Sequence, residues 1–208
     1  MRAETGSSSH APSPADRRLY LVTPVRVDLE DFLEAAIRGG VDIVQVRERD
    51  LTDGELLRAL EGVRAVTHRL DVPLVVNDRP DLAVLCGADF VHVGQDDLPV
   101  DAARRFGLGV GLSTHARREI DAAGADYIGV GPVFETPTKE GRAAVGVELV
   151  RYAAERARAP WFAVGGIDSE NLAEVVAAGA RRIAVVRAIV DSPDPERAAR
   201  DLRAALPD

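Results

Sequence analysis

The chain has 208 residues and a formal net charge of −8 at pH 7; 46% of its residues are hydrophobic and 4% are aromatic. The acidic balance argues against nucleic acid or an anionic membrane as the main partner, and a single cysteine, Cys86, excludes an internal disulfide or a multi-cysteine zinc site. No apolar run approaches the roughly 18 residues that a membrane span needs.

The chain begins with a segment that lacks the pattern of a folded element. Residues 1–18 are rich in Ser, Ala, Pro and charged side chains, and they contain no apolar stretch typical of a secretory signal. We therefore expect a disordered tail over residues 1–18 of a cytoplasmic protein. No change of composition divides the remainder, so residues 19–208 are predicted to form a single domain.

Short apolar runs alternate with amphipathic or Ala-rich stretches over the rest of the chain. The longer stretches predict helices at residues 29–37, 52–70, 148–157, 169–178 and 194–205, the second of which opens with a Thr52–Glu55 capping box. The apolar runs predict buried strands at residues 19–23, 42–46, 73–76, 90–93, 109–112, 127–130, 161–164 and 183–186. Eight such units favour an α/β fold, a closed (β/α)8 TIM barrel, over a flavodoxin-like open sheet, which needs only about five.

A short phrase recurs four times: a glycine that suits the end of a helix, followed within a few residues by an apolar strand. The copies begin at Gly40, Gly87, Gly124 and Gly179. Each glycine is predicted to adopt a left-handed conformation, and the spacing of the copies suits two strand–helix units rather than one. The phrase thus marks every second strand.

Polar residues follow the predicted strands, and in such barrels the carboxyl ends of the strands form the active site. Gly165 and Gly166 follow the seventh strand and precede a helix, so they permit close approach of a phosphate to main-chain amides. The turn at Val186 and Arg187 after the eighth strand would complete that phosphate site.

A second anion site is predicted where Arg47, Arg49 and Lys139 converge from separate loops. Asp78 and Asp97 follow adjacent strands beside these cations, which suggests a Mg²⁺ ion shared with a polyphosphate.

Simpler interpretations stay open for several of these groups. Asp78 and Asp97 suit helix caps as well as metal ligands, and Arg47 with Glu48 suits a solvated surface pair. Residues 136–138 suit a rigid loop without a ligand. His92 alternates with inward valines, so a packed, hydrogen-bonded histidine is favoured over a metal ligand.

From Leu19 to about residue 205 the chain resembles the thiamine-phosphate synthase (thiamine-phosphate pyrophosphorylase) family. The segments that carry the resemblance are LYLVT (19–23), QVRE (45–48), VNDR (76–79), VHVGQDDLP (91–99), GPVF (131–134), TPTK (136–139) and VGGI (164–167). The resemblance implies a barrel transferase that joins a hydroxymethylpyrimidine diphosphate to a thiazole phosphate and releases diphosphate. It further implies a dissociative step, with a carbocation on the pyrimidine methylene, and a Mg²⁺ cofactor.

The resemblance also implies roles for individual residues. Gln45 would hold the pyrimidine, and Asp78 and Asp97 would bind the metal. The groups around the leaving diphosphate would be Arg47, Asn77, Ser113 and Lys139, of which Lys139, Arg47 and Ser113 act as catalytic groups, with Arg49 nearby. The thiazole phosphate would meet Thr136, Thr138, Val186 and the amides of Gly165, Gly166 and Arg187.

Two positions depart from the family's commonest pattern: Arg49 replaces a usual lysine, and Arg187 replaces a frequent serine. The sequence decides neither side chain's role. Two other functions stay open, a thiazole tautomerase-like isomerase and a non-catalytic phosphate-ligand binding barrel. The predicted partners are small-molecule substrates, and a homo-oligomer is left open.

Overall fold

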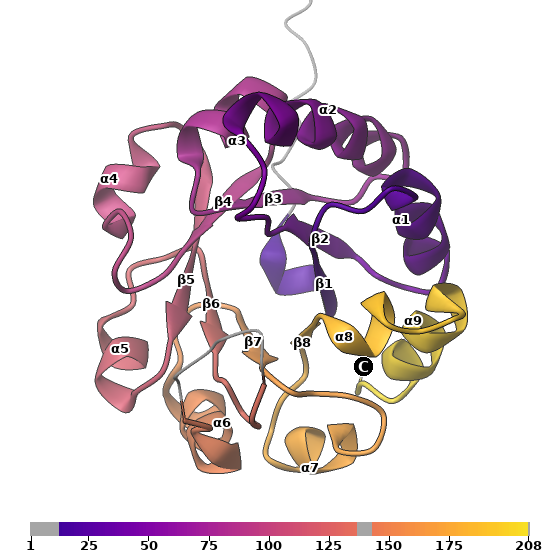
Figure 1. Ribbon diagram of the computed structural model, residues 1–208. Helices are drawn as coiled ribbons and strands as arrows, with labels where there is room; N and C mark the ends of the chain where they lie inside the picture. The colour runs from indigo at the N-terminus through magenta and orange to yellow at the C-terminus, as the bar shows by residue number, and fades with distance from the viewer. Residues whose placement is uncertain (1–12, 137–142, 208) are drawn as a thin grey trace, which may run out of the picture.

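The computed structural model describes residues 13–136 and 143–207, in which eight parallel strands close into a barrel in sequence order (Figure 1). The strands are β1 (Leu19–Thr23), β2 (Ile43–Val46), β3 (Leu74–Asn77), β4 (Phe90–Val93), β5 (Gly109–Thr114), β6 (Tyr127–Val130), β7 (Trp161–Val164) and β8 (Ile183–Val185). The predicted TIM barrel is therefore confirmed. The short apolar runs form strands because both of their faces are covered, one by helices and one by the barrel interior.

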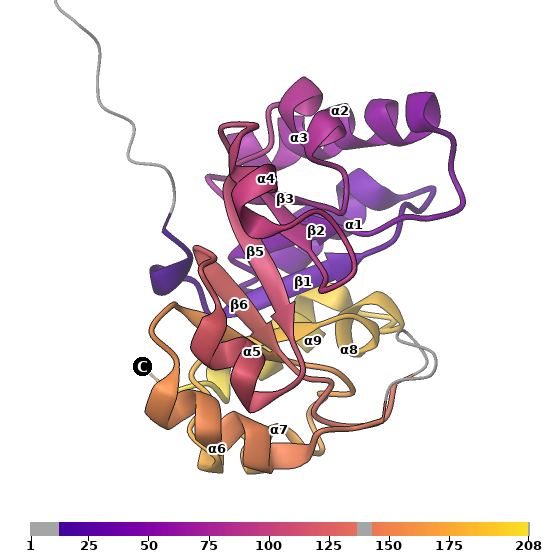
Figure 2. The same ribbon diagram turned by 90° about the vertical axis from the view of Figure 1, so that its left-hand side faces the viewer.

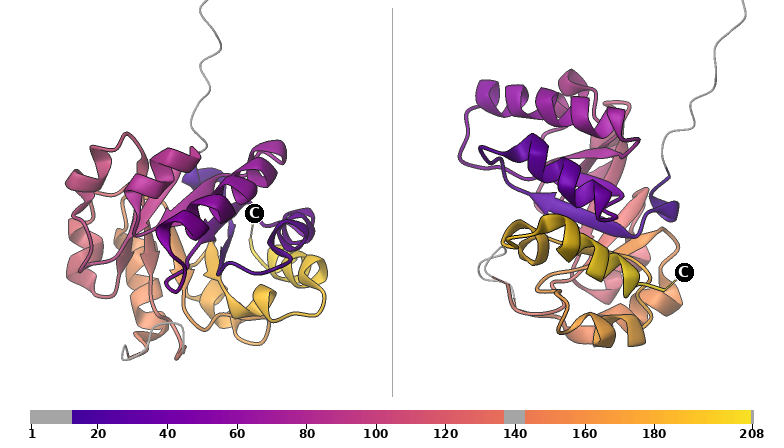
Figure 3. Two further views of the ribbon diagram at one scale, coloured as in Figure 1. Left: turned by 45° about the horizontal axis from the view of Figure 1, so that its top comes forward. Right: turned by 90° about the vertical axis from the view of Figure 1, so that its right-hand side faces the viewer.

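Helices surround the barrel in a ring (Figure 1; Figure 3). They are α1 (Leu29–Arg38), α2 (Asp53–Arg69), α3 (Pro80–Cys86), α4 (Val100–Arg104), α5 (Arg117–Ala122), α6 (Gly146–Arg156), α7 (Leu172–Ala177), α8 (Arg187–Val190) and α9 (Pro195–Ala204). The predicted capping box is present, since the Thr52 amide donates to the Glu55 carboxylate over 3.0 Å. None of the helices in the described residues is long and apolar enough to cross a membrane.

The barrel interior is filled by aromatic rings, which two glycines of β5 accommodate. Tyr20, Phe90, Tyr127 and Phe162 meet edge to face, with ring centroids 5.2–5.9 Å apart. A Cβ atom at Gly109 would lie 2.3 Å from the Phe90 ring, and one at Gly111 would lie 2.1 Å from the Tyr127 ring. Large side chains from four strands thus occupy the space that β5 leaves.

The repeated phrase secures the amino-terminal base of the barrel. In its first three copies the aspartate before the strand accepts the main-chain amide at or next to the start of the preceding strand, over 2.7–3.0 Å: Asp42 from Arg18 and Leu19, Asp89 from Leu74, and Asp126 from Val110. Asp89 and Asp126 also bind Arg64 and Arg104. The fourth copy has an arginine there instead.

The glycine conformation predicted for the phrase holds in three copies. Gly40, Gly87 and Gly179 have φ values of 113°, 71° and 103°. Gly124 is the exception, because α5 ends with the extended conformation of Ala123 rather than with a left-handed residue. A Cβ atom at Gly124 would meet nothing within 4 Å, so neither conformation nor packing requires glycine there.

The predicted disordered tail extends too far into the chain. Residues 14–16 form a short 3-10 helix, η1 (Pro14–Asp16), with Pro14 buried, and the Ala15 carbonyl accepts a hydrogen bond from Arg182. This segment lies at the same end of the barrel as the C-terminus (Figure 2). Residues 13–18 therefore belong to the folded base, while residues 1–12 lie outside the described residues.

Several element boundaries near the carboxyl ends of the strands also differ from prediction, among them the end of β5 and the start of α7. Strand β5 continues to Thr114, because Ser113 and Thr114 pair with Gly129 and Val130 of β6, and the Thr114 hydroxyl also donates to the Gly129 carbonyl over 2.9 Å. Helix α7 starts at Leu172 rather than at residue 169, because the Asp168 and Asn171 side chains bind nearby main-chain amides and hold residues 168–171 in a turn.

Candidate active site

A cavity of about 300 Å³ opens at the carboxyl end of the barrel, above the aromatic rings. Most of the residues singled out from the sequence line it: Gln45, Arg47, Asn77, Ser113, Thr136, Gly165, Gly166, Val186 and Arg187. Thr138 and Lys139 lie outside the described residues, so their predicted roles stay predictions. Arg49, Asp78 and Asp97 do not line the cavity.

A chain of hydrogen bonds crosses the cavity floor. The Gln45 amide Nε2 donates to the Tyr20 hydroxyl over 2.6 Å, and the Tyr20 and Tyr127 hydroxyls are 2.9 Å apart. His92 Nδ1 lies 3.1 Å from the Tyr127 hydroxyl, and His92 Nε2 lies 3.0 Å from Ser113 Oγ. The prediction of a packed, hydrogen-bonded His92 is confirmed.

Sequence reasoning missed Tyr20 and Tyr127 as site residues. Both sit inside strand runs that were interpreted as apolar, and both are almost fully buried, at 2% and 0% exposure. Burial raises the pKa of both phenols, so both hydroxyls keep their protons at neutral pH. The sequence did contain a sign of their role: each tyrosine places a hydroxyl inside a strand predicted to be buried, and a buried hydroxyl requires a hydrogen-bond partner.

One end of the cavity is cationic. Burial of the Arg47 guanidinium and the nearby Arg49 lower the pKa of Arg47, while Asp78 and Asp97 act in the opposite direction. Glu48 does not pair with Arg47 as the surface interpretation required: its carboxylate accepts the amides of Val25, Arg49 and Asp50. The loop is held by Glu48, and the Arg47 guanidinium makes no hydrogen bond or ion pair with another described residue.

Asp78 and Asp97 lie against each other beside Arg47. Burial and the hydrogen-bonding contact with Asp97 raise the pKa of Asp78 to about 6. Asp97 also accepts the Gly94 amide over 2.7 Å. Neither carboxylate caps a helix, because α3 and α4 have no side-chain cap. The interpretation as helix caps is therefore excluded for both aspartates, and what remains is a cluster of charges at one mouth.

The carboxylate pair fits a magnesium ion. The described residues hold no cluster of three or more His, Cys, Asp or Glu side chains suited to a metal. Mg²⁺ does not require one, because it commonly takes one or two carboxylates and completes its shell with water and phosphate oxygens. Asp78 has a φ of 60°, unusual for a residue other than glycine, so the main chain holds this carboxylate in a strained position against its like-charged neighbour.

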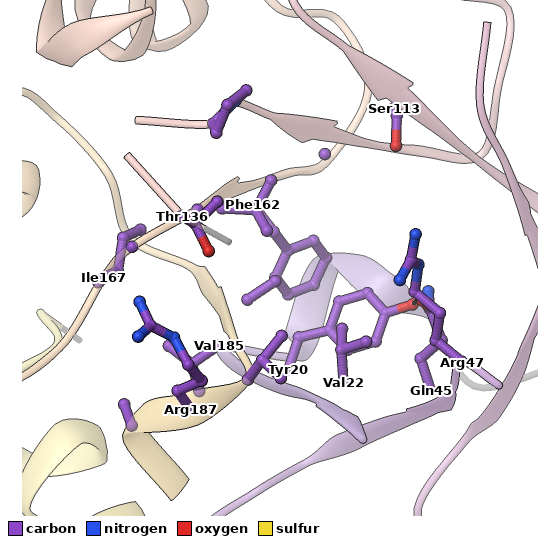
Figure 4. Close-up of a pocket in the computed structure, with 18 of the residues that line it drawn as sticks. Tyr20, Val22, Gln45, Arg47, Ser113, Thr136, Phe162, Ile167, Val185 and Arg187 are labelled. Carbon is purple, nitrogen blue, oxygen red and sulfur yellow. Dashed lines mark hydrogen bonds between the residues drawn. The ribbon is translucent and has the colours of Figure 1, made fainter. Parts of the chain in front are cut away.

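The opposite end of the cavity contains Arg187, beside Val185 and Ile167, with Tyr20 and Phe162 between it and Arg47 (Figure 4). The Arg187 guanidinium makes no hydrogen bond or ion pair with another described residue. Its side chain thus lies at the cavity, a point that the sequence left undecided.

Gly165 and Gly166 line the cavity, but the helix N-terminus predicted to follow them lies further along the chain, since α7 begins at Leu172. Both have positive φ, 105° and 65°. A Cβ atom would lie 2.5 Å from Pro132 at the first position and 2.8 Å from Phe134 at the second. The glycines therefore allow the loops after β6 and β7 to pack together, and no helix begins directly after them.

The closed barrel, with a cavity at the carboxyl ends of its strands and an arginine at each end of that cavity, is typical of a (β/α)8-barrel enzyme. The chain belongs to the thiamine monophosphate synthase family, whose profile matches residues 19–189.

Individual relatives agree with this assignment. The chain is 54% identical over 199 residues to a thiamine-phosphate synthase of Thermus thermophilus, covering 91% of this chain and 97% of the relative. It is 50% identical over 224 residues to that of an Arthrobacter species, covering 92% and 94%.

Solved structures show the same fold. The thiamine phosphate pyrophosphorylase of Pyrococcus furiosus superimposes with a TM-score of 0.85 at 30% identity, covering 92% of this chain and 96% of that one. A 3-hexulose-6-phosphate synthase, at 24% identity and a TM-score of 0.64 over 91% of this chain and 100% of that one, shares the fold alone.

Proposed function

We propose that this chain is a transferase that joins hydroxymethylpyrimidine, supplied as its diphosphate, to thiazole phosphate, giving thiamine phosphate and diphosphate. The observation that carries the proposal is the cluster of Arg47, Asp78 and Asp97 at one mouth of a cavity whose other end holds Arg187. Two separated cationic ends suit two phosphorylated substrates that meet between them. Relatives about 50% identical over most of the chain bear the name of this activity.

The reaction breaks the bond between the pyrimidine methylene carbon and the diphosphate oxygen, which keeps the electron pair. The thiazole nitrogen lone pair then forms the new carbon–nitrogen bond. Gln45 holds the pyrimidine at the cavity floor, and Arg47, Asn77 and Ser113 bind the diphosphate as its charge grows. Mg²⁺, held by Asp78 and Asp97, would supply further neutralisation of the leaving group.

No side-chain nucleophile is needed for this chemistry. Ser113 is next to His92, but the other nitrogen of His92 is bound to the Tyr127 hydroxyl rather than to a carboxylate. Neither of these two hydrogen bonds therefore supplies the carboxylate that orients a histidine as a base for serine. The residues instead position the two substrates in line and stabilise the departing anion.

The second substrate is proposed to lie at the Arg187 end. Thr136 and the main chain at Gly165 and Gly166 face this part of the cavity, and Arg187 adds a guanidinium suited to a phosphate. Thr138 and Lys139 remain proposed contacts from the segment outside the described residues. A cytoplasmic location and a homo-oligomer also remain predictions.

The test is to incubate the purified protein with both substrates, with Mg²⁺ and with EDTA in its place, and to measure thiamine phosphate and released diphosphate. We expect equal amounts of the two products, formed with Mg²⁺ and lost with EDTA. No product with both substrates and Mg²⁺ present would contradict the proposal, and isomerisation of the thiazole alone would favour the tautomerase-like alternative.

A further inference from the structure

The hydrogen-bond chain on the cavity floor joins residues from five strands. It runs from Gln45 on β2 through Tyr20 on β1, Tyr127 on β6 and His92 on β4 to Ser113 on β5. This series of hydrogen bonds therefore spans the barrel, from the residue proposed to hold the pyrimidine to the residue proposed to contact the diphosphate. Sequence reasoning assigned roles only to its two ends.

Its hydrogen atoms can be placed by counting donors and acceptors. Gln45 Nε2 carries only hydrogens, so the Tyr20 oxygen accepts from it. The one hydroxyl hydrogen of Tyr20 then goes to Tyr127, the other group within its reach. Tyr127 in turn donates to His92 Nδ1, which is therefore unprotonated, and a neutral imidazole then carries its hydrogen on Nε2.

The opposite direction fails at the Gln45 end. If His92 carried its hydrogen on Nδ1, Tyr127 would have to donate to Tyr20. The Tyr20 hydrogen would then face the Gln45 amide nitrogen, which has no lone pair to accept it with, and Tyr20 is only 2% exposed. A buried hydroxyl hydrogen without an acceptor is rare and costly, so only one direction satisfies the hydroxyls of both Tyr20 and Tyr127.

The consequence falls on Ser113. With Nε2–H donating to Ser113 Oγ, the serine hydrogen points away from His92. Gln95 fixes the same residue from the other side, because its Nε2 donates to the Ser113 carbonyl over 2.7 Å. Gly111 leaves room for the hydrogen bond between Tyr127 and His92, since a Cβ atom there would lie 2.4 Å from the Tyr127 hydroxyl and 2.6 Å from His92 Nδ1.

We infer that Tyr20, Tyr127 and His92 are positioning residues: they lock His92 as the Nε2–H tautomer and make Ser113 a hydrogen-bond donor to the anion in the cavity, not a nucleophile. The identity of that anion as diphosphate rests on the proposed function. The tautomer itself does not, because it follows from the hydrogen-bond pattern alone.

The first test reads the tautomer directly. Nitrogen-15 NMR of protein labelled at histidine, at pH 8 and without substrates, distinguishes a protonated from an unprotonated ring nitrogen; the His92 signals are identified by their loss in His92→Gln. We expect Nε2–H with an unprotonated Nδ1 in the wild type, and a mixture of tautomers in Tyr127→Phe. An Nδ1–H tautomer in the wild type, or no change in Tyr127→Phe, would overturn the inference.

The second test separates positioning from simple structural support. Tyr127→Phe keeps the ring among Tyr20, Phe90 and Phe162 and removes only the hydroxyl. We expect kcat to fall about tenfold with little change in KM, the effect of one lost hydrogen bond in the transition state. The matched control is Tyr152→Phe, which removes an exposed hydroxyl bonded to Asp121 and leaves kcat unchanged.

A double-mutant cycle completes the design. If Tyr127 acts through Ser113, Tyr127→Phe has little further effect on kcat in a Ser113→Ala background. Losses that multiply would overturn the inference by showing that the two residues act independently. A wild-type protein without any activity would contradict the proposed function instead, while the NMR measurement would still decide the tautomer.

Discussion

The two ends of the barrel differ in whether their charged side chains have partners within the protein. At the base, Asp42, Asp89 and Asp126 each accept main-chain amides, and two of them also bind an arginine. At the carboxyl end, Asp78 is held against Asp97, while Arg47 and Arg187 make no hydrogen bond or ion pair with other described residues.

The side chains at the base are thus part of the fold's own hydrogen bonding, while those at the carboxyl end are proposed to find their partners in a bound ligand. Groups at the base find their partners within the chain, so removal of one of them leaves a main-chain amide or a guanidinium without its partner. Groups at the carboxyl end oppose one another or make no pair with another described residue, so they lower the free energy of unfolding; anions and a cation are proposed to complete them. Substitutions at the two ends should therefore separate stability from activity.

The largest effect is expected for Asp97→Asn. The amide keeps an oxygen for the Gly94 amide and can donate to Asp78, but it removes one of the two charges proposed to hold Mg²⁺. We expect turnover to fall by at least about 100-fold while the protein becomes about 0.5–1 kcal/mol more stable. Steady-state kinetics and urea unfolding measure the two quantities.

Binding of thiazole phosphate, followed by calorimetry, provides the control for Asp97→Asn, because this ligand is proposed to lie at the other end of the cavity. Its affinity should stay close to the wild-type value. A matching loss of turnover and of thiazole phosphate affinity would show that Asp97 supports the loop and not the metal.

The reverse pattern is expected at the base for Asp89→Ala. This substitution leaves the Leu74 amide and the Arg64 guanidinium without their 2.9 Å partner in a part-buried position. The free energy of unfolding should fall by about 1–3 kcal/mol, with kcat and KM unchanged for the folded protein. Asp201→Ala, which removes only an exposed pair with Arg197, is the control and should change stability by less than about 1 kcal/mol.

Arg187→Ser tests whether the two cationic cavity ends serve different substrates. We expect KM for thiazole phosphate to rise about tenfold, through loss of one charge-assisted contact, and KM for the pyrimidine diphosphate to stay unchanged. Initial rates measured against each substrate in turn check this. An equal rise in both KM values would mean that the ends are not selective.

The smallest effect is expected at Gly124. Because nothing lies within 4 Å of a Cβ atom there and φ is not positive, Gly124→Ala should change stability by no more than about 1 kcal/mol, in the stabilising direction. Gly179→Ala is the contrasting variant, since φ is 103° and the new Cβ atom would lie 2.7 Å from that of Ala154. Thermal unfolding of both variants would show whether the four copies of the phrase are equivalent; a loss at Gly124 as large as at Gly179 would indicate that they are.

Features that depend on local pattern could be predicted from the sequence. The β6 strand matches its prediction because a buried parallel strand reads as an unbroken apolar run. The contact between Asp78 and Asp97 was expected for a similar reason, since neighbouring parallel strands deliver the residues that follow them to adjacent places. The order of the strands alone is therefore enough to predict that Asp78 and Asp97 lie close together.

Features that depend on the whole barrel could not be predicted. The Tyr20 and Tyr127 hydroxyls meet from strand positions 107 residues apart in the sequence, and a tyrosine in an apolar run gives no sign of which hydroxyl it will meet. The order of residues 13–18 depends likewise on Arg182, more than 160 positions later. In both cases the deciding contact exists only once the barrel has closed.

Gly111 of β5 limits how substitutions can change the shape of this cavity. The Tyr127 ring and the His92 imidazole occupy the space that Gly111 leaves free. A larger residue at 111 therefore requires changes at both Tyr127 and His92, and a smaller residue at 127 leaves a void beside Gly111. The depth of the cavity thus depends on several positions at once, and a substitution at Gly111 alone cannot change it without a clash.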